Sequence, residues 1–351
     1  MRVLPLLGLL IATSADGQGK PPLRLVLDQT IDARTGVTLG NLTGLDIGLD
    51  GTVAVVDEGN GVIYRFTPAG KLRDSLSRKG RGPGEFLESA GIALGPAGEI
   101  ALADLANRRL TFWNPAGRLV GSAALTGGTP VGLFWRGADP VLGRLFYSDS
   151  TRVEFAPVQF GNGKSAGTVV GRFSEPGKDQ RAAAVSCGSC HHTLTGDGRI
   201  LVAAPDTAYL VSEVNGSGRV VRQWFRTGVG PGQRTPEEAA RLDAKVLAGP
   251  GSGRPAPEGS PKNVPGRPQA YRPRFQGIGL DARGRLLALV SNQGSNIPVL
   301  DVFTPQGKFA GTVALPMALR SLVVRGSRVA ALGDTPEGAP AVYVFHIEEV
   351  P

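Results

Sequence analysis

The chain contains only two cysteines, two methionines and three histidines among its 351 residues. Two cysteines cannot supply the disulfide network on which small secreted scaffolds depend, so a hydrophobic core must stabilise this protein. The sequence also lacks any apolar run of about 18 residues, the length that a membrane-spanning helix needs. We therefore expect no integral membrane segment.

Glycine and proline are abundant instead, with 51 and 27 residues respectively. They do not follow a three-residue period, which excludes collagen, and their number disfavours long helices. Apolar residues make up 41% of the chain, which is too much for a wholly disordered protein. This composition is typical of a folded chain with many tight turns.

The N-terminus carries the pattern of a secretory signal peptide. A single arginine precedes an apolar run at residues 3–12, and small residues follow at residues 13–15. We assign residues 1–17 to this signal and expect a secreted or periplasmic protein. The alternative interpretation of the run is a hydrophobic first strand.

A repeat extends through the rest of the chain. Each copy has a short apolar segment, a turn that ends in glycine and a second apolar segment, at residues 45–57, 92–104, 192–204 and 278–290. Two degenerate copies surround Gly143 and Gly326. The turn glycines recur every 42–55 residues, except between Gly198 and Gly284, where a Pro-rich stretch is inserted.

The second half of the unit repeats as well. A strand, a turn containing proline and glycine, and another strand occur at residues 64–72, 112–119 and 302–309. Four strands in each unit of about 40–45 residues indicate a propeller blade, and six units predict a six-bladed, all-β propeller over residues 23–351. A two-sheet sandwich is the alternative.

The ends of the chain predict how the ring closes. The last unit has only three expected strands, while a spare strand at residues 23–31 precedes the first unit. An N-terminal strand that completes the last blade would leave no open edge.

Two stretches carry a family resemblance. Residues 91–119 (GIALGPAGEIALADLANRRLTFWNPAGRL) resemble NHL repeats, and residues 78–86 (RKGRGPGEF) resemble the inter-blade segment of secreted bacterial six-bladed propellers of that type. The resemblance implies the propeller fold. It does not imply one function, because this architecture includes binding modules, lyases and hydrolases.

A Pro- and Gly-rich insertion occupies residues 227–274, between the fourth and fifth units. Its beginning, with Thr235 as N-cap, predicts a helix over residues 235–247 followed by extended chain. The insertion has eight basic and four acidic residues and therefore contributes +4 to the net charge of +8 of the whole chain. It could contact an anionic polymer, a lipid head group or an acidic protein, or be a solvated loop. The candidate ligand-binding residues are Arg254, Lys262, Arg267, Arg272 and Arg274.

Cys187, Cys190 and His191 form a C-x-x-C-H motif, the attachment signal for c-type haem in an exported protein. In this interpretation the two thiols bind the haem vinyl groups and His191 ligates the iron. The candidates for the distal ligand are His192, Met317 and His346. The alternatives are a local disulfide or two packed thiols, and the repeat places His192 inside a strand that faces the central channel.

Other residues favour structural roles. Asp57 and Asp104 recur at the end of the second strand, where a carboxylate can accept hydrogen bonds from turn amides. The glycine-rich residues 80–84 and 228–232 lack the context of a phosphate-binding loop and are interpreted as inter-blade turns. The tryptophans are expected in the core between blades, at positions 113, 135 and 224.

Propeller lyases and lactonases that depend on a metal take ligands from several blades. Here the equivalent positions are pairs of glycine and an aliphatic residue, at residues 44–45, 91–92 and 277–278. We therefore predict a non-enzymatic binding or scaffold protein, without a cofactor, monomeric, and with no nucleic-acid partner. A haem c electron-transfer protein is the alternative, and a lyase or hydrolase at the channel is the third hypothesis.

Overall fold

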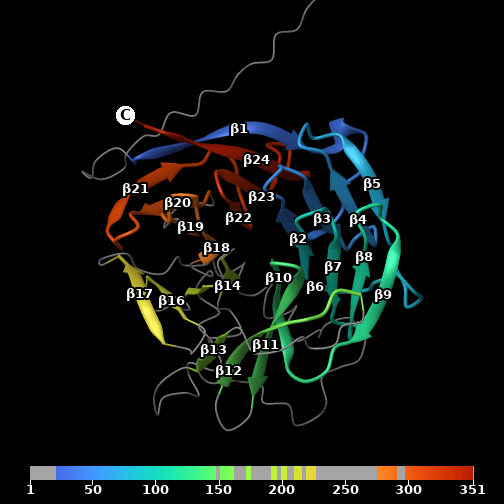
Figure 1. Cartoon of the computed structure of the whole chain (residues 1–351). Coiled ribbons are helices and arrows are strands. Elements are labelled where there is room, and N and C mark those ends of the chain that lie inside the picture. The colour runs from blue at the N-terminus through green and yellow to red at the C-terminus, as the bar shows by residue number, and fades with distance from the viewer. Residues whose placement is uncertain are drawn as a thin grey trace, which may run out of the picture.

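Each repeated unit of sequence forms one four-stranded antiparallel sheet, and six such sheets form a ring around a central channel (Figure 1). The computed structural model describes residues 21–147, 151–161, 171–174, 191–195, 199–203, 209–215, 219–226, 275–290 and 297–350. The predicted signal peptide, the whole basic insertion with its expected helix, and both cysteines lie outside these residues.

In blades 1 to 5 the strands follow one another in chain order from the channel outward. Blades 1 and 2 are formed by β2 (Leu42–Ile47), β3 (Val53–Asp57), β4 (Val62–Phe66), β5 (Leu72–Leu76), β6 (Ser89–Leu94), β7 (Ile100–Asp104), β8 (Arg109–Trp113) and β9 (Leu119–Ala124). Blades 3 and 4 are formed by β10 (Thr129–Arg136), β11 (Asp139–Tyr147), β12 (Thr151–Pro157), β13 (Gly171–Ser174), β14 (His191–Leu194), β15 (Ile200–Ala203), β16 (Leu210–Val214) and β17 (Val220–Phe225).

Blade 5 and the closing blade 6 complete the ring. Their strands are β18 (Phe275–Leu280), β19 (Leu286–Val290), β20 (Val299–Phe303), β21 (Phe309–Ala314), β22 (Val323–Arg325), β23 (Arg328–Asp334), β24 (Pro340–Glu349) and β1 (Leu23–Ile31). Within the described residues, the helical content is a single 3₁₀ turn at Ala33–Thr35. The six-bladed, all-β prediction is therefore confirmed.

One prediction about the third blade was wrong. Gly143 does not close a turn but lies inside β11, where it pairs with Gly132 and Phe155 on either side. The turn is formed by Gly137, whose φ of +60° suits glycine. The prediction was wrong because β10 and β11 are longer than their counterparts, so the turn precedes the position that the spacing indicates.

The N-terminal strand closes the ring as predicted. β1 pairs with β24 from Leu23 through Ile31, and the sheet order is β1-β24-β23-β22. Leu23, Leu25 and Ile31 are at most 1% exposed. The first and last described strands therefore hold each other in place (Figure 1).

A charged cluster lies across this closure. His346 Nδ1 is 2.6 Å from the Asp28 carboxylate of β1, and its Nε2 is 3.1 Å from the Glu348 carboxylate, which also pairs with Arg24. Partial burial lowers the pKa of His346, but the two carboxylates outweigh it and raise that pKa above its ordinary value. The protonated imidazole is thus the form that stabilises the closure.

This cluster predicts a pH-dependent stability. Because the folded-state pKa is raised, the contribution of His346 is complete below the unfolded value of about 6.5 and is lost as the pH rises through the folded value. We expect His346→Gln to lower the free energy of unfolding at pH 5.5 by less than about 1 kcal/mol, since the side chain is over a third exposed. Urea denaturation of both proteins at pH 5.5 and 9 measures this, and a difference that grows with pH would contradict it.

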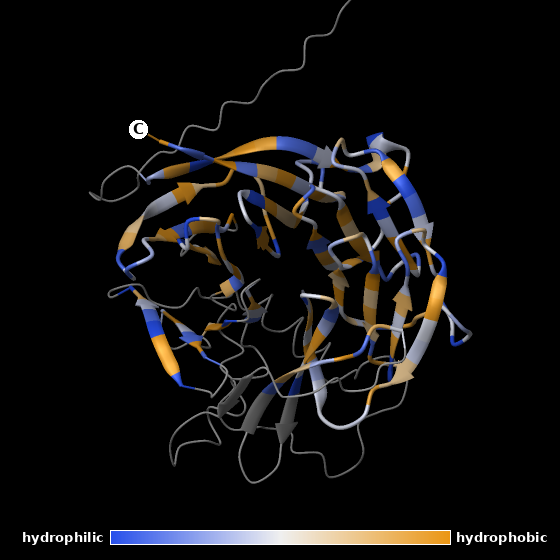
Figure 2. Ribbon diagram, in the orientation of Figure 1, coloured by the Kyte–Doolittle hydropathy of each residue, from blue (hydrophilic) through white to orange (hydrophobic). Residues whose placement is uncertain are grey.

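Apolar side chains fill the space between neighbouring blades, and Figure 2 shows hydrophobic residues concentrated in the strands of the ring. At the closure, for example, Ile31 and Val344 of blade 6 pack with Leu45 and Phe66 of blade 1 in one buried cluster.

Polar contacts also join the blades. Each predicted Pro-containing turn offers its proline carbonyl to a side chain of the preceding blade. These hydrogen bonds run from Gln29 to Pro68, from Arg65 to Pro115 and from Arg222 to Pro305.

Arg65 makes the most extensive of these contacts. It lies on β4 with no exposed surface, and its Nε donates to Asp74 at 2.7 Å. Its Nη1 donates to the carbonyls of Gly98 and Pro115 in blade 2, at 2.8 and 2.9 Å. A buried guanidinium thus joins blades 1 and 2.

Candidate functional site

Glycine lets the first strands of neighbouring blades pack closely around the channel. A bulge precedes Gly44, Gly91, Gly132 and Gly277 in β2, β6, β10 and β18. A Cβ at Gly277 would lie 2.7 Å from the backbone nitrogen of Leu322 in the next blade. Gly44 and Gly91 likewise lie against the next blade, at Ile92 and Leu133, so these glycines serve the packing of one blade on the next.

One end of the channel opens into a cavity of about 350 Å³, at the turns that join each first strand to the second. We call this cavity the channel mouth. All six blades contribute to its wall, through residues that include Gly48, Gly95, Gly137, Thr195, Leu280 and Gly326. A ligand here would contact the whole ring.

The charged groups of the channel mouth are mainly positive. Among the residues that the structure describes, Arg73, Arg136 and Arg325 line it, and Asp50 supplies a carboxylate. Asp50 accepts hydrogen bonds from the amide and hydroxyl of Thr52, at 2.9 and 2.8 Å, and is thus engaged within its own turn. In the described part of the chain, Arg73 and Arg136 have no carboxylate within ion-pair distance. Arg73 Nη2 donates to the Pro115 carbonyl at 3.0 Å, and the other donors of these two guanidinium groups are available to an anion.

Trp135 forms an aromatic part of the wall. Its ring lies so close to Gly95 that a Cβ there would be 2.8 Å from the ring, and its other neighbour is Phe160 at 5.5 Å between centroids. Trp113 and Trp224 are buried as predicted, at 3% and 0% exposure. Trp135 differs because it is the penultimate residue of β10, beside the turn, where it packs against Gly95 and also lines the channel mouth.

A second cavity of about 170 Å³ lies deeper in the channel, and we call it the inner chamber. Arg325 and Thr193 line both cavities. Much of the chamber wall is apolar, with Leu45, Ile92, Leu133, Ile278 and Leu322. Its polar groups include His192, Gln276 and Ser321.

One ion pair of the channel joins Arg325, which lines both cavities, to Asp46, which lines the inner chamber. Arg325 Nη2 lies 3.3 Å from the carboxylate of Asp46, which is 3% exposed. The same carboxylate accepts hydrogen bonds from the backbone amides of Ile47 and Leu94, both at 2.9 Å. Asp46 therefore has two backbone partners besides Arg325.

The haem hypothesis stays a prediction, because Cys187 and Cys190 lie outside the described residues. His191 begins β14. The next residue, His192, lines the inner chamber with its ring 6.2 Å from that of Phe155. The other candidate distal ligands are placed elsewhere: Met317 packs against the apolar cluster between blades 5 and 6, and His346 lies at the ring closure.

The predicted basic ligand face also stays a prediction. Its five residues, Arg254, Lys262, Arg267, Arg272 and Arg274, lie outside the described residues, as does the second glycine-rich segment at residues 228–232. The described chain ends at residue 226, after β17, and resumes with β18 at residue 275.

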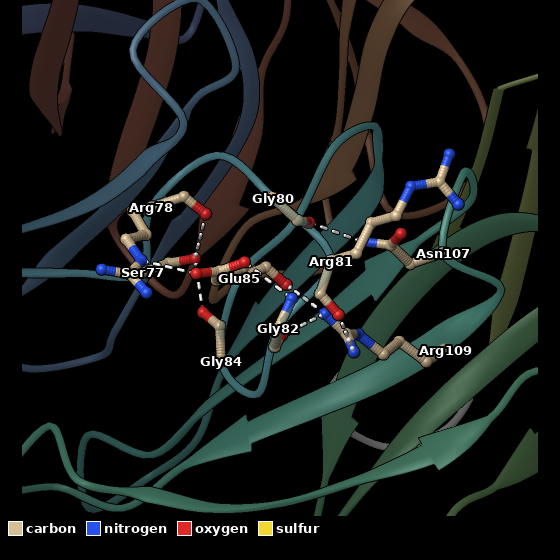
Figure 3. A network of polar contacts seen from close by, with 9 residues as sticks. All are labelled: Ser77, Arg78, Gly80, Arg81, Gly82, Gly84, Glu85, Asn107 and Arg109. Carbon is tan, nitrogen blue, oxygen red and sulfur yellow. Dashed lines mark hydrogen bonds and ion pairs between the residues drawn. The ribbon is translucent and has the colours of Figure 1, made fainter.

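The first glycine-rich loop, residues 80–84, connects blade 1 to blade 2 and is drawn in Figure 3. The carboxylate of Glu85 accepts hydrogen bonds from the Gly82 amide at 2.6 Å and from Arg78 Nε at 2.5 Å. These contacts lower the pKa of Glu85 below its ordinary value. Arg109 of β8 donates to three carbonyl groups of this segment, at 2.6–3.0 Å. The amide and guanidinium groups of this segment thus bind the Glu85 carboxylate, and the segment connects two blades, which confirms the prediction of an inter-blade turn.

The recurrent aspartates have the predicted structural role. Asp57 accepts hydrogen bonds from the amides of Gly40 and Asn60, at 2.7 and 3.1 Å, and Asp104 does the same for Asn107 at 3.3 Å. Among the residues that the structure describes, no group of three or more His, Cys, Asp or Glu side chains could hold a metal ion. Likewise, no described helix is long and apolar enough to cross a membrane.

Sequence reasoning missed the arginines of the channel mouth. The signal was present, because Arg136 and Arg325 each precede the turn glycine of a hairpin, Gly137 and Gly326. The misplaced turn at Gly143 concealed the first of these two Arg-Gly pairs.

Comparisons with known proteins support the fold. No family model matches the sequence, and no curated protein matches it. Among solved structures, a protein from Bacteroides fragilis NCTC 9343 described as exported has a TM-score of 0.54 at 11% identity, covering 96% of this chain and 98% of its own. A gluconolactonase from Xanthomonas campestris has a TM-score of 0.50 at 12% identity, covering 96% and 94%. At these identities the similarity shows the six-bladed propeller, and the finer NHL-repeat assignment stays a prediction.

Proposed function

We propose that this protein is a non-enzymatic binding propeller that holds an organic anion at its channel mouth. The observation that supports the proposal is the charge of a cavity to which all six blades contribute, where the charged lining groups among the described residues are Arg73, Arg136 and Arg325 and the carboxylate of Asp50. The sequence pattern of a signal peptide at residues 1–17 supports an exported location as part of the same proposal.

The chemistry of the site favours an anion of more than one charge. A cavity of about 350 Å³ lies within the usual range of small-molecule sites, roughly 300–1,000 Å³. Guanidinium groups present a planar fork of donors that matches carboxylate or phosphate oxygens. With two arginines free of carboxylate partners in the described part of the chain, an incoming anion does not have to displace an existing ion pair at either one.

Citrate is a suitable test anion because it carries three carboxylates. We expect citrate to bind at low ionic strength and to weaken with added salt. Arg136→Ser and Arg73→Ser should each reduce the affinity by about 5-fold, the effect of losing one partly exposed charged contact of about 1 kcal/mol. Isothermal titration calorimetry measures the binding.

The matched control is Arg118→Ser, which removes an exposed arginine that does not line the channel mouth. Its affinity for citrate should equal that of the unmodified protein. Equal losses in the Arg118 and Arg136 variants would show that citrate responds to net charge, and the proposal would then fail.

A further inference from the structure

The channel contains two cavities of different character, and Arg325 lines both. We propose that the ligand is an amphipathic organic anion, one carboxylate of which pairs with Arg325 while its apolar body occupies the inner chamber. This inference rests on the proposed function and defines the class of anion that the channel mouth admits.

The inner chamber has the size and lining for an apolar group. Its volume of about 170 Å³ is close to that of an engineered protein cavity of about 150 Å³ that binds benzene. Leu133, Ile278 and Leu322 are at most 6% exposed and form part of its wall. A ring or branched chain placed there would leave water and gain free energy in proportion to its apolar area.

One polar group of the inner chamber is available to hydrogen-bond a ligand. The Ser321 hydroxyl is buried and has no hydrogen-bond partner among the described residues. Buried hydroxyls without a partner are rare in folded proteins because they lose their hydrogen bonds to water. A ligand that carries a hydroxyl or carbonyl on its apolar body would supply that bond.

Arg325 is able to exchange partners. It contacts Asp46 through one nitrogen at 3.3 Å, which is longer than a good charge-assisted hydrogen bond of about 2.7–2.9 Å. Asp46 keeps its two backbone hydrogen bonds when Arg325 moves away. A ligand carboxylate entering from the channel mouth can therefore take a bidentate position on Arg325 and open the way to the inner chamber.

Acetate and phenylacetate form the decisive pair of probes, because they share the carboxylate and differ by the ring. In the unmodified protein we expect phenylacetate to bind at least about 10-fold more tightly than acetate, from burial of the ring. Arg325→Met should weaken both. Ser321→Leu, which fills the chamber, should reduce phenylacetate to the affinity of acetate while citrate still binds, and citrate binding shows that this variant is folded.

Ser122→Leu serves as the matched control, since it adds the same side chain on the exposed strand β9. It should retain the full preference for phenylacetate. Equal affinities for acetate and phenylacetate in the unmodified protein, with citrate still bound through Arg136, would overturn this inference and leave the proposed function standing. Failure of citrate to bind, or its indifference to Arg136→Ser, would instead overturn the proposed function.

Discussion

Replacing Arg65 by methionine should lower the free energy of unfolding by about 3 kcal/mol, close to the lower end of the range for breaking a buried ion pair. The change leaves Asp74 without its guanidinium and removes the donor from the carbonyls of Gly98 and Pro115. Asp74 is 31% exposed, so water compensates part of the loss. Urea denaturation followed by tryptophan fluorescence measures the difference.

Two further variants test whether the lost ion pair and hydrogen bonds of Arg65 cause this loss of stability. Arg118→Met makes the same chemical change at an exposed position and should alter the free energy of unfolding by less than about 0.5 kcal/mol. Arg65→Lys keeps the charge but not the fork of donors, so its loss should fall between the two. A stability of Arg65→Met equal to that of Arg118→Met would show that the join between blades 1 and 2 does not depend on this residue.

A chain that begins at Asp32, and therefore lacks β1, should not fold into a stable ring. Burial of Leu23, Leu25 and Ile31 contributes about 1.5–3 kcal/mol for each side chain. The sum is comparable to the whole stability of a typical domain, about 5–15 kcal/mol. The truncated protein should lose its cooperative thermal transition in circular dichroism and elute as aggregates, because β24 becomes an open edge.

The control is a chain that begins at Pro21, which keeps β1 and should melt like the full chain. A peptide of residues 21–32 added to the truncated protein should restore a cooperative transition, since it can pair with β24 as β1 does. If the chain from Asp32 melts cooperatively as a monomer without the peptide, β1 is not required for closure.

The ring was predictable because its signals are local and repeated. A glycine marks the first hairpin turn of a blade, and a proline marks a later turn. The spare strand at residues 23–31 completes the last blade, which has only three other strands. Blade 3 shows the limit of this reasoning. Strand length there depends on pairing between β10 and β11, which the repeat spacing does not encode, and the turn was therefore assigned to Gly143 in place of Gly137.

The candidate site could not be predicted in the same way. Arg325 and Asp46 are 279 positions apart in the sequence and meet because blade 6 returns to blade 1. Arg73, at the start of an outer strand, reaches the channel mouth only through the space between two blades. Each residue alone resembles an ordinary surface charge, so the site becomes visible only when the ring is closed.

The pairing of β1 with β24 also determines the order in which the chain can fold. Arg24 and Glu348 are 324 positions apart, and contacts across such separations form slowly. During synthesis the blades can assemble only as an open arc, since β24, the partner of β1, is made after every other strand of the ring. Joining the two ends is therefore a late step in folding, and separating them is an early step in unfolding. Contacts at this seam should then govern the lifetime of the native protein more than its folding rate.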